Sequence, residues 1–86
     1  MSTTTQHTVT TEYASLGLTV AKNIHICNVG SEEIELFFGA SASASDTGIY
    51  LAPKDSLNFE LETGENCFAR VYDKAGVGSV VTITPA

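Results

Sequence analysis

The chain has 86 residues, of which 43% are hydrophobic and 16% charged, so it is apolar enough to fold as one domain. Ten acids against four bases give a net charge of −6, which argues against nucleic acid as a partner because phosphate contacts need clustered Lys and Arg. The same charge argues against anionic membrane surfaces, and no apolar run approaches the roughly 18–20 residues that span a bilayer. We therefore expect binding to neither nucleic acid nor membranes.

Residues 1–12 are rich in threonine and nearly free of apolar side chains, so they bury little surface alone. Because β-branched Thr favours extended backbone, the segment is predicted to be an extended arm, with residues 13–86 forming the single domain. Such an arm is either disordered or adds a strand to the sheet of a neighbouring subunit, and the sequence leaves both open. The segment has no basic or apolar region of a secretory signal, which predicts a cytosol-like compartment.

Short apolar stretches follow at the spacing of β-strands. A first strand is expected near residues 17–21, and residues 23–29 carry apolar side chains on both parities, which predicts a central strand. Residues 34–38 alternate strictly, which predicts a strand with one face in the core. Residues 40–45 contain only Ala and Ser, which favours a flexible, exposed loop.

The clearest pattern lies in residues 47–61, where two alternating runs flank Pro53. Proline presets φ for the first corner of a turn, so this stretch predicts a hairpin that leaves Tyr50 exposed. Further strands are expected at residues 67–72 and 77–84, joined by a tight turn over residues 73–76 and a hairpin at residues 76–78. The core residues predicted for residues 47–61 are Ile49, Leu51, Leu57, Phe59 and Leu61.

These elements define the predicted fold class. Six or seven short strands, separated by turns and without helical periodicity, predict an all-β protein. We expect a small antiparallel β-sandwich with an extended N-terminal arm.

Side chains that could carry chemistry are few. His7 and His25 have no partner at ligand or triad spacing, so His7 is expected to be solvated and His25 to form a local hydrogen bond. Cys27 and Cys67 are predicted to be buried free thiols, and the alternative is one disulfide formed after release from the cell. Asp46 alone offers too few oxygens for calcium.

The acids are interpreted as solvated strand surfaces, and the pairs concerned are Glu33 with Glu35 and Glu60 with Glu62. A glycosidase would need two carboxyls across a cleft, for which so small a sandwich has little room. The sequence therefore predicts no catalytic, cofactor-binding or metal-binding residue, and a protein that is not an enzyme.

Aromatic side chains occur on strand faces that are otherwise polar. Aromatic residues and Arg are enriched at protein interfaces, so these side chains indicate a surface covered by a partner. The alternative is that they line the core. The predicted partner contacts are Tyr13, Phe37, Tyr50, Phe68, Arg70 and Tyr72.

Residues 20–84 resemble small β-sandwich proteins of tailed bacteriophages, found as capsid decoration or head-accessory proteins and as tail or fibre modules. One departure is Lys54-Asp55, where a Gly-Glu or Gly-Asp pair would be more typical after the proline. The resemblance rests on Ile24-His-Ile-Cys-Asn-Val-Gly30, Ile34-Glu-Leu-Phe-Phe-Gly39, Gly48-Ile-Tyr-Leu-Ala-Pro53, Cys67-Phe-Ala-Arg70 and the final Val-rich strand.

The resemblance implies a structural protein that decorates the outer capsid and stabilises it by bridging capsid subunits. It implies the major capsid protein or another virion protein as the partner, a homo-oligomer with a trimer as first choice, and a place in the virion after synthesis in the host cytoplasm. Two alternatives stay open: another virion part at the head–tail junction, tail or fibre, and a carbohydrate-binding module that uses the aromatic side chains for stacking.

Overall fold

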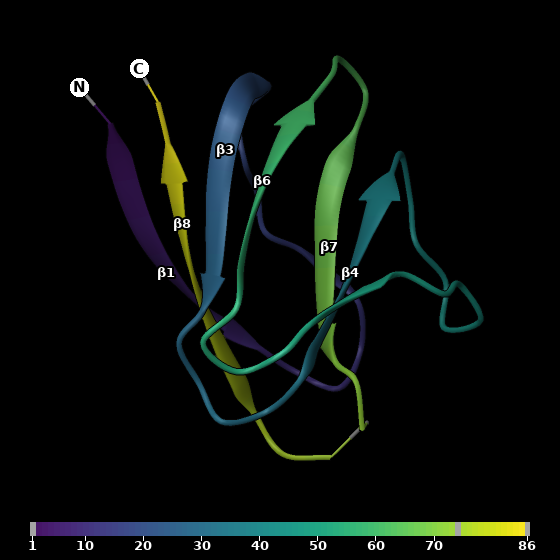
Figure 1. The fold of residues 1–86 in the computed structure, drawn as a ribbon. Helices are drawn as coiled ribbons and strands as arrows, with labels where there is room; N and C mark the ends of the chain where they lie inside the picture. The colour runs from purple at the N-terminus through teal and green to yellow at the C-terminus, as the bar shows by residue number, and fades with distance from the viewer. Residues whose placement is uncertain (1, 74, 86) are drawn as a thin grey trace.

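The computed structural model describes residues 2–73 and 75–85, and it is an antiparallel β-sandwich without helices in those ranges, which confirms the predicted fold class. Eight strands form two four-stranded sheets, which Figure 1 shows as two layers. Sheet I has the order β1-β8-β3-β6, and sheet II the order β2-β7-β4-β5. The strands are β1 (Thr3–Val9), β2 (Ala14–Ser15), β3 (Ala21–Asn28), β4 (Ile34–Gly39), β5 (Ile49–Leu51), β6 (Ser56–Leu61), β7 (Asn66–Val71) and β8 (Gly78–Thr84).

Among the strands in the described ranges, β4 and β5 are consecutive in the chain and share a sheet, whereas all other consecutive strands lie in opposite sheets. Both predicted hairpins are therefore wrong. In residues 47–61, β5 pairs with β4 in sheet II whereas β6 pairs with β3 in sheet I. After the turn at Gly76, which has the expected positive φ of 80°, β7 and β8 also separate into the two sheets. Lys74, within that predicted turn, lies outside the described residues.

The segment expected to be an arm is extended, but it belongs to the sandwich. Residues Thr3–Val9 pair with β8 of the same chain, from Thr3 opposite Thr84 to Val9 opposite Gly78, and Val9 is buried in the core. Strand formation here needs little apolar burial because β8 supplies the backbone hydrogen-bonding partners. The strand expected near residues 17–21 is also wrong, since β2 ends before this stretch and β3 begins at its last residue.

The core lies between the two sheets and is built from one face of every strand except β2, whose two residues are exposed. The predicted central strand and the predicted half-buried strand are confirmed as β3 and β4. In residues 47–61, Leu51 and Leu61 are buried and Leu57 and Phe59 pack against the core, but Ile49 is 49% exposed on the edge strand β5. The buried apolar residues are Val9, Ile24, Ile26, Ile34, Leu36, Leu51, Leu61, Cys67, Ala69, Val71 and Val80.

The turn after β5 has the geometry of a type II turn. The Asp55 amide donates to the Ala52 carbonyl at 3.0 Å, Pro53 occupies the first corner, and Lys54 has a φ of 72°. A positive φ at the second corner favours glycine, because the Cβ of an L-residue is crowded in the left-handed region.

Lys54→Gly is therefore expected to raise the free energy of unfolding by about 0.5–1 kcal/mol, since relief of the left-handed strain outweighs the extra freedom of the unfolded chain. Lys54→Ala, which removes the side chain but keeps the strain, should stay within about 0.5 kcal/mol of the parent. Urea unfolding measures both, and equal stabilities of the two variants would contradict the prediction.

The two cysteines are free thiols in different surroundings. Cys67 is buried in the core, and burial raises the pKa of its thiol to about 12. Cys27 is only half-buried, because it lies between the inward-facing Ile26 and Asn28 and so faces the outside of sheet I.

A thiol reagent should consequently modify one cysteine in the native protein and the second only after unfolding, because the thiolate is the reactive form. Cys27→Ser should remove the native-state reaction, and Cys67→Ser should leave it. Titration with a chromogenic disulfide reagent, with and without denaturant, checks this. Equal rates for both thiols in the folded protein would refute it.

Candidate functional site

The outer face of sheet II gathers the residues that the sequence predicted as partner contacts. Glu35 of β4 lies opposite Arg70 of β7 and Tyr50 of β5, and Phe37 lies opposite Phe68. Their neighbours along β4 and β7 are buried in the core, so these side chains point outward. We call this surface the aromatic face, and it comprises Tyr13, Glu35, Phe37, Tyr50, Phe68, Arg70 and Tyr72.

Tyr13 joins the aromatic face from the segment before β2. Its ring lies 4.0 Å from the guanidinium carbon of Arg70 and 5.9 Å from the ring centroid of Phe37. The structure therefore brings the six predicted residues together on the outer face of sheet II. They do not line the core between the sheets, which was the alternative. Their contact with a partner stays a prediction.

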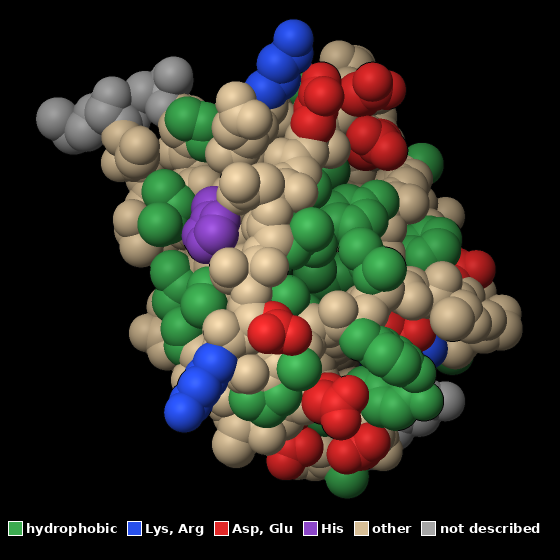
Figure 2. Space-filling model, viewed as in Figure 1, with side chains coloured by type: hydrophobic (Ala, Val, Ile, Leu, Met, Phe, Trp, Pro, Cys, Tyr) green, Lys and Arg blue, Asp and Glu red, His purple; other side chains and the backbone are tan. Residues whose placement is uncertain are grey.

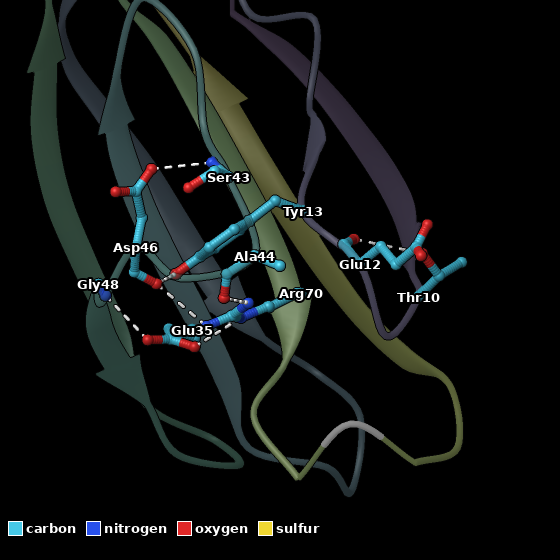
Figure 3. Close-up of polar contacts among 9 residues, drawn as sticks. All are labelled: Thr10, Glu12, Tyr13, Glu35, Ser43, Ala44, Asp46, Gly48 and Arg70. Carbon is cyan, nitrogen blue, oxygen red and sulfur yellow. Dashed lines mark hydrogen bonds and ion pairs between the residues drawn. The ribbon is translucent and has the colours of Figure 1, made fainter.

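Residues 40–48 fold over part of the aromatic face and are held there (Figure 3). Arg70 donates from Nη1 to the Ala44 carbonyl at 2.8 Å and from Nη2 to the Asp46 carbonyl at 3.1 Å. The Tyr13 hydroxyl donates to the same Asp46 carbonyl at 3.2 Å. The loop expected to be flexible is thus exposed but anchored, and the chain itself covers part of the face.

Glu35 and Arg70 form an ion pair beneath this loop. Arg70 Nε lies 2.7 Å from Glu35 Oε1, and the two side chains are only 7% and 4% exposed respectively. The other carboxylate oxygen of Glu35 accepts from the Gly48 amide at 2.8 Å. Glu35, expected to be a solvated surface acid, is therefore a buried partner of Arg70, because the cover of the loop excludes water from it.

The surroundings of Glu35 act on its pKa in opposite directions. Burial alone would raise it, but the hydrogen bonds from the Gly48 amide and from Arg70 outweigh burial and hold the pKa of the carboxyl below its usual value. The hydrogen bond to Glu35 in turn raises the pKa of Arg70. The pair is therefore ionised at neutral pH.

This depressed pKa makes the stability of the domain acid-sensitive. The contribution of Glu35 is present above its unfolded-state pKa and is lost as the pH falls through the lower folded-state value. In urea unfolding over an acidic pH series, the stability difference between the parent and Glu35→Gln should shrink as the pH falls. A difference that stays constant down to the acid limit would contradict the prediction.

Two clefts of about 370 Å³ each flank the ion pair. One lies between Tyr13 and the loop, with Glu12 and Arg70 in its wall. The other is lined by Tyr50, Tyr72 and Asp73 together with the ion pair.

Tyr50 and Tyr72 are the exposed part of the aromatic face. Their rings meet edge to face, with centroids 4.3 Å apart and an interplanar angle of 70°, and the residues are 56% and 39% exposed. The adjacent Tyr72 hydroxyl raises the pKa of Tyr50 to about 12, so this phenol is neutral at physiological pH. An aromatic pair of this kind offers an apolar surface with polar tips.

The histidines lie elsewhere, in sheet I. His25 Nδ1 is 2.6 Å from Asn58 Oδ1, the local hydrogen bond that was expected. His7 is not solvated in an arm: it is half-buried on β1, with Nε2 2.8 Å from Thr82 Oγ1, and burial lowers its pKa. In the described part of the chain no group of three or more His, Cys, Asp or Glu is placed to hold a metal ion.

The structure is therefore a small antiparallel β-sandwich whose aromatic face is partly covered by residues 40–48 of the same chain. Comparisons with protein-family models, with curated proteins and with solved structures find no match for this chain. Within residues 2–73 and 75–85, no helix is long and apolar enough to cross a membrane.

Proposed function

We propose that this protein is a structural virion protein of a tailed phage, which decorates the outer capsid and stabilises it by bridging capsid subunits. The proposal starts from the resemblance of residues 20–84 to small β-sandwich proteins of phage particles. The observation that carries it further is the exposed Tyr50–Tyr72 pair on the aromatic face.

A binding surface of this kind benefits from rigidity. Tyrosine offers a large contact area with few rotatable bonds, so its immobilisation on binding costs little entropy. Beneath it, the Glu35–Arg70 pair and the loop hydrogen bonds fix the positions of β4, β7 and residues 40–48. We infer that the partner meets a surface that is already formed.

The charge of the protein favours a partner with basic groups at the contact. Asp73 lines the cleft beside Tyr50 and Tyr72, and the whole chain carries a net charge of −6. In the view of Figure 2, acidic side chains gather toward the top and the bottom of the molecule, with apolar side chains between them. Complementary charge on a coat protein would steer encounter and fix orientation.

The test mixes the purified protein with undecorated capsids and counts bound copies from a gel of isolated particles. We expect saturation at many copies, and a loss of at least tenfold in affinity for Tyr50→Ser/Tyr72→Ser, because interface tyrosines each contribute about 1 kcal/mol or more. Val20→Ser is the matched control, since Val20 is 50% exposed but lies in a separate cleft with Lys22 and Thr84. Absence of binding, or only a few copies per particle, would overturn capsid decoration; a few copies would indicate a head–tail, tail or fibre part.

The cleft beside Tyr50 and Tyr72 also favours a second candidate, a carbohydrate-binding module. Exposed aromatic rings beside the Asp73 carboxylate combine a stacking surface with a hydrogen-bond acceptor, both of which a sugar uses. Binding of the isolated protein to a glycan array, abolished by Tyr72→Ala, would favour this function over decoration. A blank array together with saturable capsid binding would exclude it.

A further inference from the structure

Strand β1 is the longest free edge of the sandwich. The four edge strands are β1 and β6 in sheet I and β2 and β5 in sheet II. β2 has two residues and β5 has three, whereas β1 has seven, from Thr3 to Val9. A free edge presents unpaired backbone donors and acceptors along its length, so its capacity for pairing grows with its length.

β1 also lacks the devices that usually protect an edge. Its sequence Thr-Thr-Thr-Gln-His-Thr-Val contains no Lys, Asp, Glu or Pro, and burial lowers the pKa of His7, which keeps the strand uncharged at neutral pH. The other long edge, β6, contains Glu60 and is flanked by Asp55 and Glu62, which repel a second acidic strand. Pairing is therefore favoured at β1 and opposed at β6.

We propose that two copies of this chain associate through β1. The two β1 strands pair antiparallel about a twofold axis, so that sheet I of one copy continues into sheet I of the other. The strand is complementary to itself in this arrangement. With the axis at Gln6, Thr4 lies opposite Thr8 of the second copy and Thr5 lies opposite His7 of the second copy. Every facing pair is uncharged, and five of the seven residues of β1 are β-branched, which suits cross-strand packing.

A second copy fits this edge better than an unrelated strand does. The twofold arrangement uses the same edge on both copies, so it closes at two and leaves no further copy of β1 free. If β1 paired instead with β6 of another copy, the resulting dimer would still have one free β1 edge and one free β6 edge. That pairing would also bring Glu60 into the contact. The inference does not depend on the proposed function, and it differs from the trimer implied by the phage resemblance.

Two double variants test both the dimer and its register. Thr4→Lys/Thr8→Lys places like charges opposite each other across the axis, whereas Thr4→Glu/Thr8→Lys places opposite charges there. Both positions are exposed, and their neighbours on β8 within the same copy are the uncharged Ile83 and Ser79. Neither variant therefore faces a charge on β8 within its own copy, and urea unfolding verifies that both fold.

Analytical ultracentrifugation of the purified proteins over a range of concentrations provides the measurement. We expect the parent and Thr4→Glu/Thr8→Lys to form dimers that dissociate on dilution, and Thr4→Lys/Thr8→Lys to be a monomer with at least a tenfold weaker association. A monomeric or trimeric parent overturns the proposal. So does equal association of the two variants, because residues 4 and 8 face each other across the axis only in the twofold register.

Discussion

Arg70→Met is expected to lower the free energy of unfolding by about 2–4 kcal/mol, because it leaves the Glu35 carboxylate buried without its cation. The loss lies at or below the roughly 3–5 kcal/mol usual for a fully buried pair, since the Gly48 amide still donates a hydrogen bond to the Glu35 carboxylate in the variant. Against a total stability of roughly 4–13 kcal/mol for a domain of this size, the variant loses a large share. The loop over residues 40–48 should loosen as well, because Arg70 holds the carbonyls of Ala44 and Asp46.

A double-mutant cycle separates the ion pair from the packing around it. Glu35→Leu/Arg70→Met removes both charges and should recover most of the stability lost in Arg70→Met, because no unpaired charge remains. Glu60→Gln, on the exposed face of β6, is the control and should stay within about 0.5 kcal/mol of the parent. Additive losses in the cycle, measured by urea unfolding, would show that the pair acts as two independent side chains.

Gly48→Ala should be the most damaging glycine-to-alanine substitution in this protein. A Cβ at residue 48 would fall on the Leu36 carbonyl oxygen and lie 2.6 Å from its carbon, in the backbone of strand β4. Backbone cannot rotate away as a side chain does, so the start of β5 must move and the hydrogen bond from the Gly48 amide to Glu35 is lost. We expect a loss of about 3 kcal/mol or more.

Gly64→Ala is the matched control for this effect. A Cβ at Gly64 meets open space, and its φ of +88° adds only the strain of a left-handed L-residue, about 1 kcal/mol. Thermal unfolding followed by circular dichroism should rank Gly48→Ala well below Gly64→Ala. Equal losses would mean that the β4–β5 contact adjusts freely, which would contradict the close approach at Gly48.

The alternation of apolar side chains predicted the faces of the strands but not their partners. Ile34 and Leu36 were assigned to the core from their spacing alone, because a period of two determines which side chains share a face. The turn at Pro53 was also predicted, yet a turn is local, and nothing in it tells whether β5 and β6 pair with each other. The pairing of β1 within its own sheet is not predictable from the pattern, since Val9 is its one buried apolar residue.

The candidate site was predictable to the same extent. Phe37, Phe68 and Arg70 share the outward parity of β4 and β7, so their assembly on one face follows once those strands are neighbours. Glu35 shares that parity too, but its burial depends on residues 40–48 folding back over the sheet. A run of Ala and Ser carries no periodic signal for such a path, so the acid was interpreted as a solvated one.

The position of β8 has a consequence for how the protein is made. It is the last strand in the chain, yet it lies between β1 and β3 and pairs with both. On the ribosome, β1 and β3 become neighbours in sheet I only after residues 78–84 have been translated, whereas β3 and β6 can pair before that. Such distant pairing closes long loops and is typical of domains that fold in milliseconds to seconds. The nascent chain therefore exposes β1 and β3 without their common neighbour at the stage when aggregation competes with folding.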